Sequence, residues 1–225
     1  MVDIVLFAAF PYVAVVLAVV VTFYRYYSDR FSYSSFSSQF LENRALFWGS
    51  VPWHFGILII LSAHLLALLF PGVWRTLISA PTRLYILEVI GLALALAALL
   101  ALALLLVRRL LNERVSVVTS GMDWVLLLVL LAQMALGFWV AIFYRWGSDW
   151  YLHTAVPWIQ SLARLDPETQ FVTNLPWLVK LHMLGGFMLI ALFPFTRLVH
   201  MITFPITYLW RPYQVVIWYR DQRHA

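Results

Sequence analysis

Cysteine is absent from the 225 residues of the chain, and this absence excludes several kinds of site. Disulfide bonds, thiolate-bound iron–sulfur clusters, covalently attached c-type haem and cysteine-based zinc or redox centres all require thiols. A metal held by this chain must therefore have histidine or carboxylate ligands.

Charge is also scarce, because only 11% of the residues are charged while 64% are hydrophobic. A soluble chain of this length could not hide so much apolar surface in one core, so we expect its solvent to be lipid. The net charge of +5 does not indicate a nucleic-acid partner, because the Lys and Arg residues are scattered and form no basic block.

Long apolar runs predict an all-α integral membrane protein with five transmembrane helices, since about 20 helical residues cross a bilayer. The runs are continuous and do not alternate with polar residues, which favours helices over the strands of a membrane barrel. The predicted spans are Ile4 to Tyr24, Leu46 to Phe70, Leu84 to Val107, Trp124 to Tyr144, and Trp177 to about His200. We expect residues 1–225 to form one membrane domain.

The distribution of Lys and Arg predicts the orientation, because cytoplasmic loops collect these residues. Ten of them fall on the side of the first and third loops and the C-terminal tail, and five fall on the other side. The N-terminus is therefore expected outside and the C-terminus inside. Between Trp146 and Pro176 the chain is expected to leave the membrane on the outer side, with a short helix around Pro157 to Arg164.

Four of the six histidines lie within predicted spans, where ionisable side chains are costly and usually functional. His54 and His64 are in the second span and are about 15 Å apart along a helix axis. His182 and His200 are in the fifth span, on one helix face and about 27 Å apart. Since the two spans run in opposite directions, His64 pairs with His182 in the outer half, and His54 pairs with His200 in the inner half.

Two imidazoles from facing helices match the axial ligands of a six-coordinate b-type haem. The separations of about 15 and 27 Å on the two helices differ by about 12 Å. We expect a bend of the fifth span at Pro194 to accommodate this difference. Gly56, Gly185 and Gly186 could make room for a porphyrin or only for a neighbouring helix.

Three alternative roles for the four histidines remain open. A zinc or di-iron site would favour ligands at i and i+3 or i+4, a spacing that these histidines lack. A proton-coupled transporter would favour acidic residues within spans, where only Glu88 qualifies. Packing histidines satisfied by backbone groups account for one or two positions better than for four in matched pairs.

The residues around these histidines resemble the gamma subunit of the membrane-bound respiratory nitrate reductases, and the similarity runs through nearly the whole chain. The stretches that carry it are Trp53-His-Phe-Gly-Ile-Leu, Ser62-Ala-His64, Lys180-Leu-His182, and Leu192-Phe-Pro-Phe-Thr-Arg-Leu-Val-His200. Further ones are Phe10-Pro-Tyr-Val, Ser37-Ser-Gln39, Thr119-Ser-Gly-Met-Asp123, and Pro205-Ile-Thr-Tyr-Leu-Trp-Arg-Pro-Tyr213.

The resemblance implies a five-helix cytochrome b in the cytoplasmic membrane of a prokaryote. It implies an outer haem on His64 and His182 and an inner haem on His54 and His200. The family oxidises quinol, either menaquinol or ubiquinol, near the outer haem. It passes electrons inward to an iron–sulfur beta subunit and a molybdenum-containing alpha subunit, so that this chain itself reduces no nitrate. Alternatives are the di-haem b subunit of a related sulfite-reduction or heterodisulfide-reductase complex, or a haem-free transporter or anchor.

Several polar residues are candidates for supporting roles. Arg197, one turn before His200, could pair with a haem propionate on the inner side or anchor the helix at the membrane surface. His64, Arg83, Tyr85 and Glu88 are the polar groups nearest to the expected quinol site. The polar inner loop 32–38 and the tail 201–225 lie where an iron–sulfur subunit is expected to dock.

Overall fold

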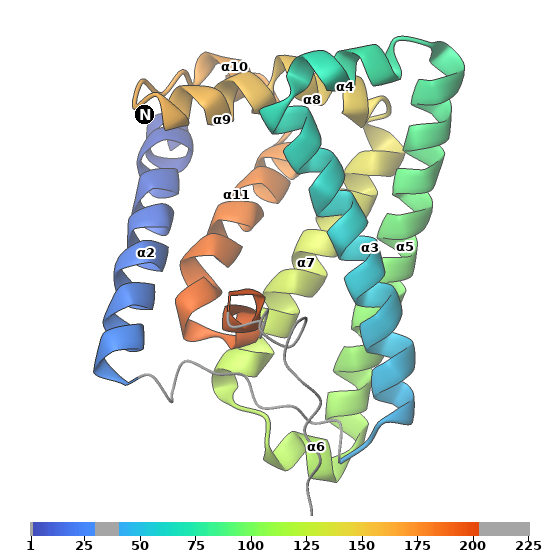
Figure 1. The fold of residues 1–225 in the computed structure, drawn as a ribbon, viewed down its shortest axis with the longest axis vertical. Coiled ribbons are helices and arrows are strands. Elements are labelled where there is room, and N and C mark those ends of the chain that lie inside the picture. The colour runs from blue at the N-terminus through green and yellow to red at the C-terminus, as the bar shows by residue number, and fades with distance from the viewer. Residues whose placement is uncertain (1, 30–40, 203–225) are drawn as a thin grey trace, which may run out of the picture.

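The computed structural model describes residues 2–29 and 41–202, and every regular element in these two ranges is a helix. The long elements run between the two ends of a bundle, and short helices cross one end (Figure 1). The long elements are α2 (Phe10–Ser28), α3 (Arg44–Leu69), α5 (Pro81–Leu111), α7 (Gly121–Phe143) and α11 (Trp177–Leu192). The short ones are α1 (Val2–Ile4), the π-helix η1 (Val5–Ala9), α4 (Pro71–Ile78), α6 (Glu113–Val117), α8 (Gly147–His153), α9 (Ala155–Ala163), α10 (Gln170–Thr173), and the 3₁₀ turns η3 (Phe193–Phe195) and η4 (Arg197–Met201).

Among the described residues, five helical segments are long and apolar enough to cross a membrane, which agrees with the predicted number. They are Val2–Ser28, Arg44–Leu69, Pro81–Leu111, Gly121–Phe143 and Trp177–Phe195. The short helix expected around Pro157 to Arg164 is present as α9, and α4, α8 and α10 lie with it at the same end of the bundle (Figure 1). The loop 32–38, expected on the inner side, lies outside the described residues, as does the tail from position 203.

The fifth span differs from its prediction, because one continuous helix does not reach His200. The α-helix ends at Leu192, and Pro194 lies in the 3₁₀ turn η3. Thr196 is then extended, with φ −124° and ψ 177°, before η4 begins. Proline lacks an N–H and clashes with the preceding helical turn, so it ends regular helix at the point where a bend was expected. The prediction that His182 and His200 share one helix face five turns apart is therefore wrong.

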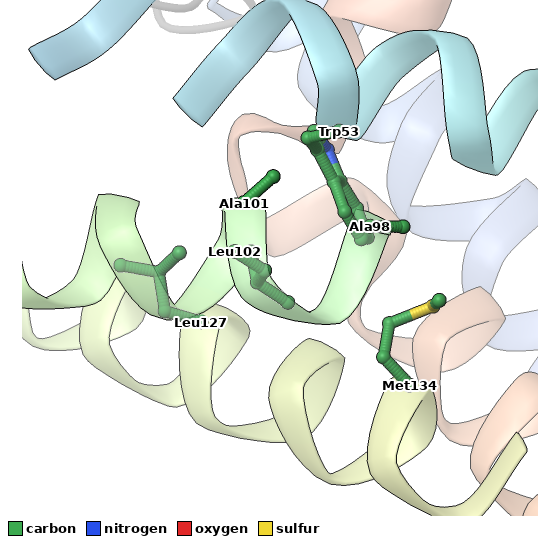
Figure 2. Packing of buried hydrophobic residues seen from close by; sticks show 6 residues of the cluster. All are labelled: Trp53, Ala98, Ala101, Leu102, Leu127 and Met134. Atoms are coloured by element: carbon green, nitrogen blue, oxygen red, sulfur yellow. The ribbon is translucent and has the colours of Figure 1, made fainter. Parts of the chain in front are cut away.

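Helices α3, α5 and α7 pack closely around a cluster of buried apolar residues (Figure 2). Trp53 of α3 lies against Ala98 and its neighbours on α5, and Leu127 of α7 closes the cluster. Gly56 allows this close approach, because a Cβ at this position would lie only 3.0 Å from the Ala98 Cβ atom. Its role is thus close packing of two helices, the second of the two roles that the sequence left open.

Side-chain donors that reach backbone carbonyls attach the short helices to the spans. Pro11 has no N–H to offer the Phe7 carbonyl in an α-helical turn, and the buried indole of Trp158 donates to that oxygen at 2.8 Å. Trp74 donates to the Ser148 carbonyl of α8 in the same way, at 2.9 Å. These bonds fix α8 and α9 over the ends of the spans.

Buried charges at the two ends of the bundle are paired. At the α6 end, Arg108 is 5% exposed and its Nε donates to the Glu42 carboxylate at 2.6 Å. This hydrogen bond is the main reason why the pKa of Glu42 lies below its usual value. At the α9 end, Lys180 donates to Asp3 at 3.1 Å and to the Thr173 carbonyl at 2.7 Å. The first of these Lys180 bonds ties the N-terminal turn to α11.

Candidate functional site

His54 and His200 lie side by side in the half of the bundle nearest α6. Their ring centres are 6.1 Å apart and their planes are inclined by 74°. The Nδ1 atom of His54 is 2.7 Å from the Ser50 carbonyl oxygen and 3.1 Å from the Ser50 hydroxyl. The Nδ1 atom of His200 is 2.5 Å from the Arg197 carbonyl oxygen. Since a carbonyl only accepts, each Nδ1 carries a proton, and each Nε2 keeps the lone pair that a metal needs.

The break in the fifth span is what brings His200 to this place. The segment that carries it is held to α7 by Arg197, whose guanidinium donates to the Asp123 carboxylate at 2.5 and 2.8 Å. Asp123 also forms the capping box of α7 with Ser120. Arg197 therefore positions His200 by fixing η4 against the start of α7. The predicted role of Arg197 as a propionate partner stays a prediction.

His64 lies in the other half of α3, toward the short helices. Its Nδ1 atom is 2.8 Å from the Ile60 carbonyl oxygen, so the Nε2 lone pair is again left available. Tyr151 of α8 packs edge-on against this ring, with 5.4 Å between the ring centres. Burial raises the pKa of Tyr151 to about 12, so the phenol stays neutral at physiological pH. Sequence reasoning missed Tyr151, because nothing in a loop sequence indicates which ring it will cover.

His182 projects from α11 toward α7. Its ring lies against Gly137, where a Cβ would be 2.8 Å from the His182 Cε1 atom. One turn earlier on α7, the amide Nε2 of Gln133 donates to the His182 carbonyl oxygen at 2.9 Å. Gly137 and Gln133, on one face of α7, therefore contact this histidine and hold it in place.

Gln133 and Gly137 were missed at the level of sequence, although a signal for them exists. Gln133 is the one amide in an otherwise apolar run, and polar residues within spans tend to be functional. Gly185, expected to make room, does so for Gln133, whose Oε1 atom lies 2.1 Å from the position of an added Cβ. Gly186 has nothing within 4 Å of such an atom.

The arrangement in pairs suits a bis-histidine haem in two respects. Metal–imidazole bonds of about 2 Å, with the metal midway, separate two ring centres by roughly 6 Å, which agrees with the 6.1 Å between His54 and His200. In addition, His54, His64 and His200 are exposed although the spans face hydrocarbon, where an imidazole without a polar or metal partner is costly. Within residues 2–29 and 41–202, His, Asp and Glu side chains do not gather in threes that could hold a metal ion.

The polar residues predicted near the quinol site are mostly bonded to other parts of the protein. Arg83 donates to the Leu77 carbonyl at 2.8 Å and to the Ser79 hydroxyl at 2.8 Å, which caps the end of α4. Glu88 accepts the Ser148 N–H at 2.8 Å and so ties α5 to α8. Tyr85 is 61% exposed. A hollow of about 340 Å³ lies beside these residues, lined by Ile78, Ser79, Pro81, Leu84, Trp146 and Asp149.

Comparison with known proteins agrees with the family resemblance of the histidine segments. The family model described as nitrate reductase gamma subunit matches residues 3–219. The nitrate reductase gamma chain of Bacillus subtilis (strain 168) is 32% identical over 216 residues, covering 94% of this chain and 96% of that one. The respiratory nitrate reductase 1 gamma chain of Escherichia coli (strain K12) is 30% identical over 215 residues, covering 93% and 95%. The nitrate reductase-like protein NarX of Mycobacterium tuberculosis is 33% identical over 211 residues, which are 90% of this chain but 32% of that protein. The chain belongs to the nitrate reductase gamma subunit family and is a subunit of a nitrate reductase complex.

Proposed function

We propose that this chain is the quinol-oxidising, di-haem b-type subunit of its nitrate reductase complex. The observation that carries the proposal is the pairing of histidines across the bundle, with His54 against His200 at a ring-centre distance of 6.1 Å. We take His64 of α3 and His182 of α11 as the second pair, in the half of the bundle nearer the short helices. Together the four would supply the axial ligands of two haems.

The chain's own residues support this role by fixing the imidazoles. Backbone carbonyls hold Nδ1 of His54, His64 and His200, so that the lone pair of Nε2 is available and the ring plane is set. When bound, the haems would supply one-electron carriers with both axial positions filled, which suits electron transfer and disfavours oxygen binding. The two pairs lie in opposite halves of the spans, so they offer a path along the membrane normal.

The direction of transfer follows from the proposed orientation, with the N-terminus outside and the C-terminus inside a prokaryotic cytoplasmic membrane. Menaquinol or ubiquinol would be oxidised near the pair of His64 and His182, and its protons would leave to the outside. Electrons would pass inward to an iron–sulfur beta subunit and then to a molybdenum-containing alpha subunit, where nitrate is reduced. Each charge moved across the bilayer is worth about 2.3 kcal/mol per 100 mV.

The quinol site is proposed beside His64, within reach of Arg83, Tyr85 and Glu88. The exposed phenol of Tyr85 is available to a lipid-soluble substrate. Arg83 and Glu88 shape the adjoining loop through the bonds that they make to α4 and α8. Their contribution would then be to hold the wall of the site.

A spectrum of the purified complex tests the proposal. The dithionite-reduced minus oxidised spectrum is expected to show two b-type haems per copy of this chain, and added quinol should reduce them. A chain without b-type haem, or haems that quinol does not reduce, would exclude the proposed function.

A further inference from the structure

His182 differs from the other three histidines in the hydrogen bonding of its Nδ1 atom. His54, His64 and His200 each place Nδ1 against a backbone carbonyl three or four residues earlier. The Nδ1 atom of His182 is buried and has no hydrogen-bond partner. The fourth imidazole therefore needs an acceptor from outside its own helix.

Gln133 has a buried acceptor that lacks a donor, as His182 has a buried Nδ1 that lacks a partner. Its Oε1 atom is buried and also lacks a partner, and in the part of the chain that the structure describes these two are the buried side-chain polar atoms left unsatisfied. Its Nε2 atom already donates to the His182 carbonyl oxygen at 2.9 Å, so the amide is linked to this histidine. Leaving a buried donor and a buried acceptor unpaired is costly, because each has lost its hydrogen bonds to water without replacement.

The backbone around the two side chains is shaped for their approach. An added Cβ at Gly185 would lie 2.1 Å from Gln133 Oε1, and one at Gly137 would lie 2.8 Å from His182 Cε1. A side chain at either glycine would therefore displace the amide or the imidazole from its place between α7 and α11. The two atoms are not hydrogen-bonded to each other in this structure, but both side chains lie between the same two helices.

We propose that Gln133 is a positioning residue for the outer haem ligand: its Nε2 holds the His182 backbone, and its Oε1, which is unpaired in this structure, would turn to accept the His182 Nδ1–H when the haem is bound. This inference rests on the proposed function, because it concerns His182 as an axial ligand. An acceptor on Nδ1–H fixes the ring orientation and makes the coordinating nitrogen more basic. A more basic ligand favours ferric iron, so Gln133 lowers the reduction potential of the haem on His64 and His182.

The test is a potentiometric titration of both haems in the intact complex, followed by their absorbance. The variant Gln133→Leu removes donor and acceptor with little change of volume, and Gln133→Glu keeps an acceptor oxygen. The matched control is Gln160→Leu, which removes a similar bond, from Gln160 Nε2 to the Leu68 carbonyl at 3.1 Å, in which no histidine takes part.

Gln133→Leu is expected to shift the ferric to ferrous ratio of the outer haem about tenfold toward ferrous, a rise of about 59 mV for one electron. The inner haem should keep its potential. Gln133→Glu should show no such rise, and Gln160→Leu should leave both potentials unchanged. An unshifted outer haem in Gln133→Leu, equal shifts of both haems, or a rise in Gln133→Glu would overturn the inference. A wild-type complex without two b-type haems would instead defeat the proposed function itself.

Discussion

Replacing Asp123 by Asn should release the segment that carries His200 while leaving the other histidine pair in place. The substitution keeps a side-chain oxygen that can accept the Ser120 N–H of the capping box. It removes the negative charge that accepts two hydrogen bonds from Arg197, at 2.5 and 2.8 Å. Arg109 also loses the attraction of this carboxylate, which is 4.0 Å away.

The size of the effect follows from burial. Removing one partner of a buried ion pair costs about 3–5 kcal/mol, because the other charge is left without compensation. The Asp123 side chain is 5% exposed but that of Arg197 is 25% exposed, so water recovers part of the loss. We expect a cost of about 3 kcal/mol, which weakens the attachment of η4 about a hundredfold.

The assay is thermal release of each haem from the purified complex, followed by absorbance. Asp123→Asn and Arg197→Gln should each lower the release temperature of the inner haem, and the double variant should cost less than the sum of the two. The matched control is Arg164→Gln, which removes an exposed ion pair to Glu168 and should cost at most about 0.5 kcal/mol. Equal release of both haems in Asp123→Asn, or additive effects in the double variant, would refute the positioning role.

Three further changes have expected outcomes. Trp158→Phe removes the indole donor to the π-helical turn and should lower the free energy of unfolding by about 1–3 kcal/mol; an unchanged thermal melting curve would contradict this. Gly137→Ala should expel the outer haem, because its Cβ would overlap the His182 ring, whereas Gly91→Ala, which meets nothing within 4 Å, should retain both haems by absorbance. Because the folded protein raises the pKa of Tyr151 to about 12, the stability that this contributes is present below pH 10 and is lost between pH 10 and about 12; Tyr151→Phe should make a denaturation series flatter over that interval, and an identical pH dependence would exclude the effect.

The five spans could be predicted because length and hydropathy alone decide whether a helix can cross a bilayer. Their ends shifted by a few residues, as with Pro81–Leu111 against the predicted Leu84 to Val107. Hydropathy does not indicate the residue at which helical hydrogen bonding ends. The apolar run through Pro194 therefore looked continuous, although the helix ends at Leu192.

The histidine pairs were predicted from topology, and the structure places His54 beside His200 as expected. The distances along the fifth span were wrong, since they assumed one straight helix. Because the chain is extended at Thr196, the separation of about 27 Å that a continuous helix implied does not apply. Pro194 indicated where the helix would be interrupted. The place of His200 after that break depends on the Arg197–Asp123 bond, which joins residues 74 positions apart and leaves no local sequence pattern.

Contacts between helices were the least predictable part of the candidate site. Gln133 and Gly137 are four positions apart on α7, yet only the packing of α11 against that face shows that they hold His182. In a membrane span, apolar residues pack against lipid and protein alike, so sequence does not show which face meets a neighbour. A lone polar residue in such a run is the best available indication.

Haem content after single histidine substitutions tests the central claim most directly. In His64→Ala and His182→Ala, the purified complex should lose one b-type haem and keep the other, measured as haem per chain and by the reduced minus oxidised spectrum. In His54→Ala and His200→Ala, the haem that remains should be the one lost from the first two variants. Loss of both haems from every variant, or one identical remaining haem in all four, would contradict the account of two separate pairs.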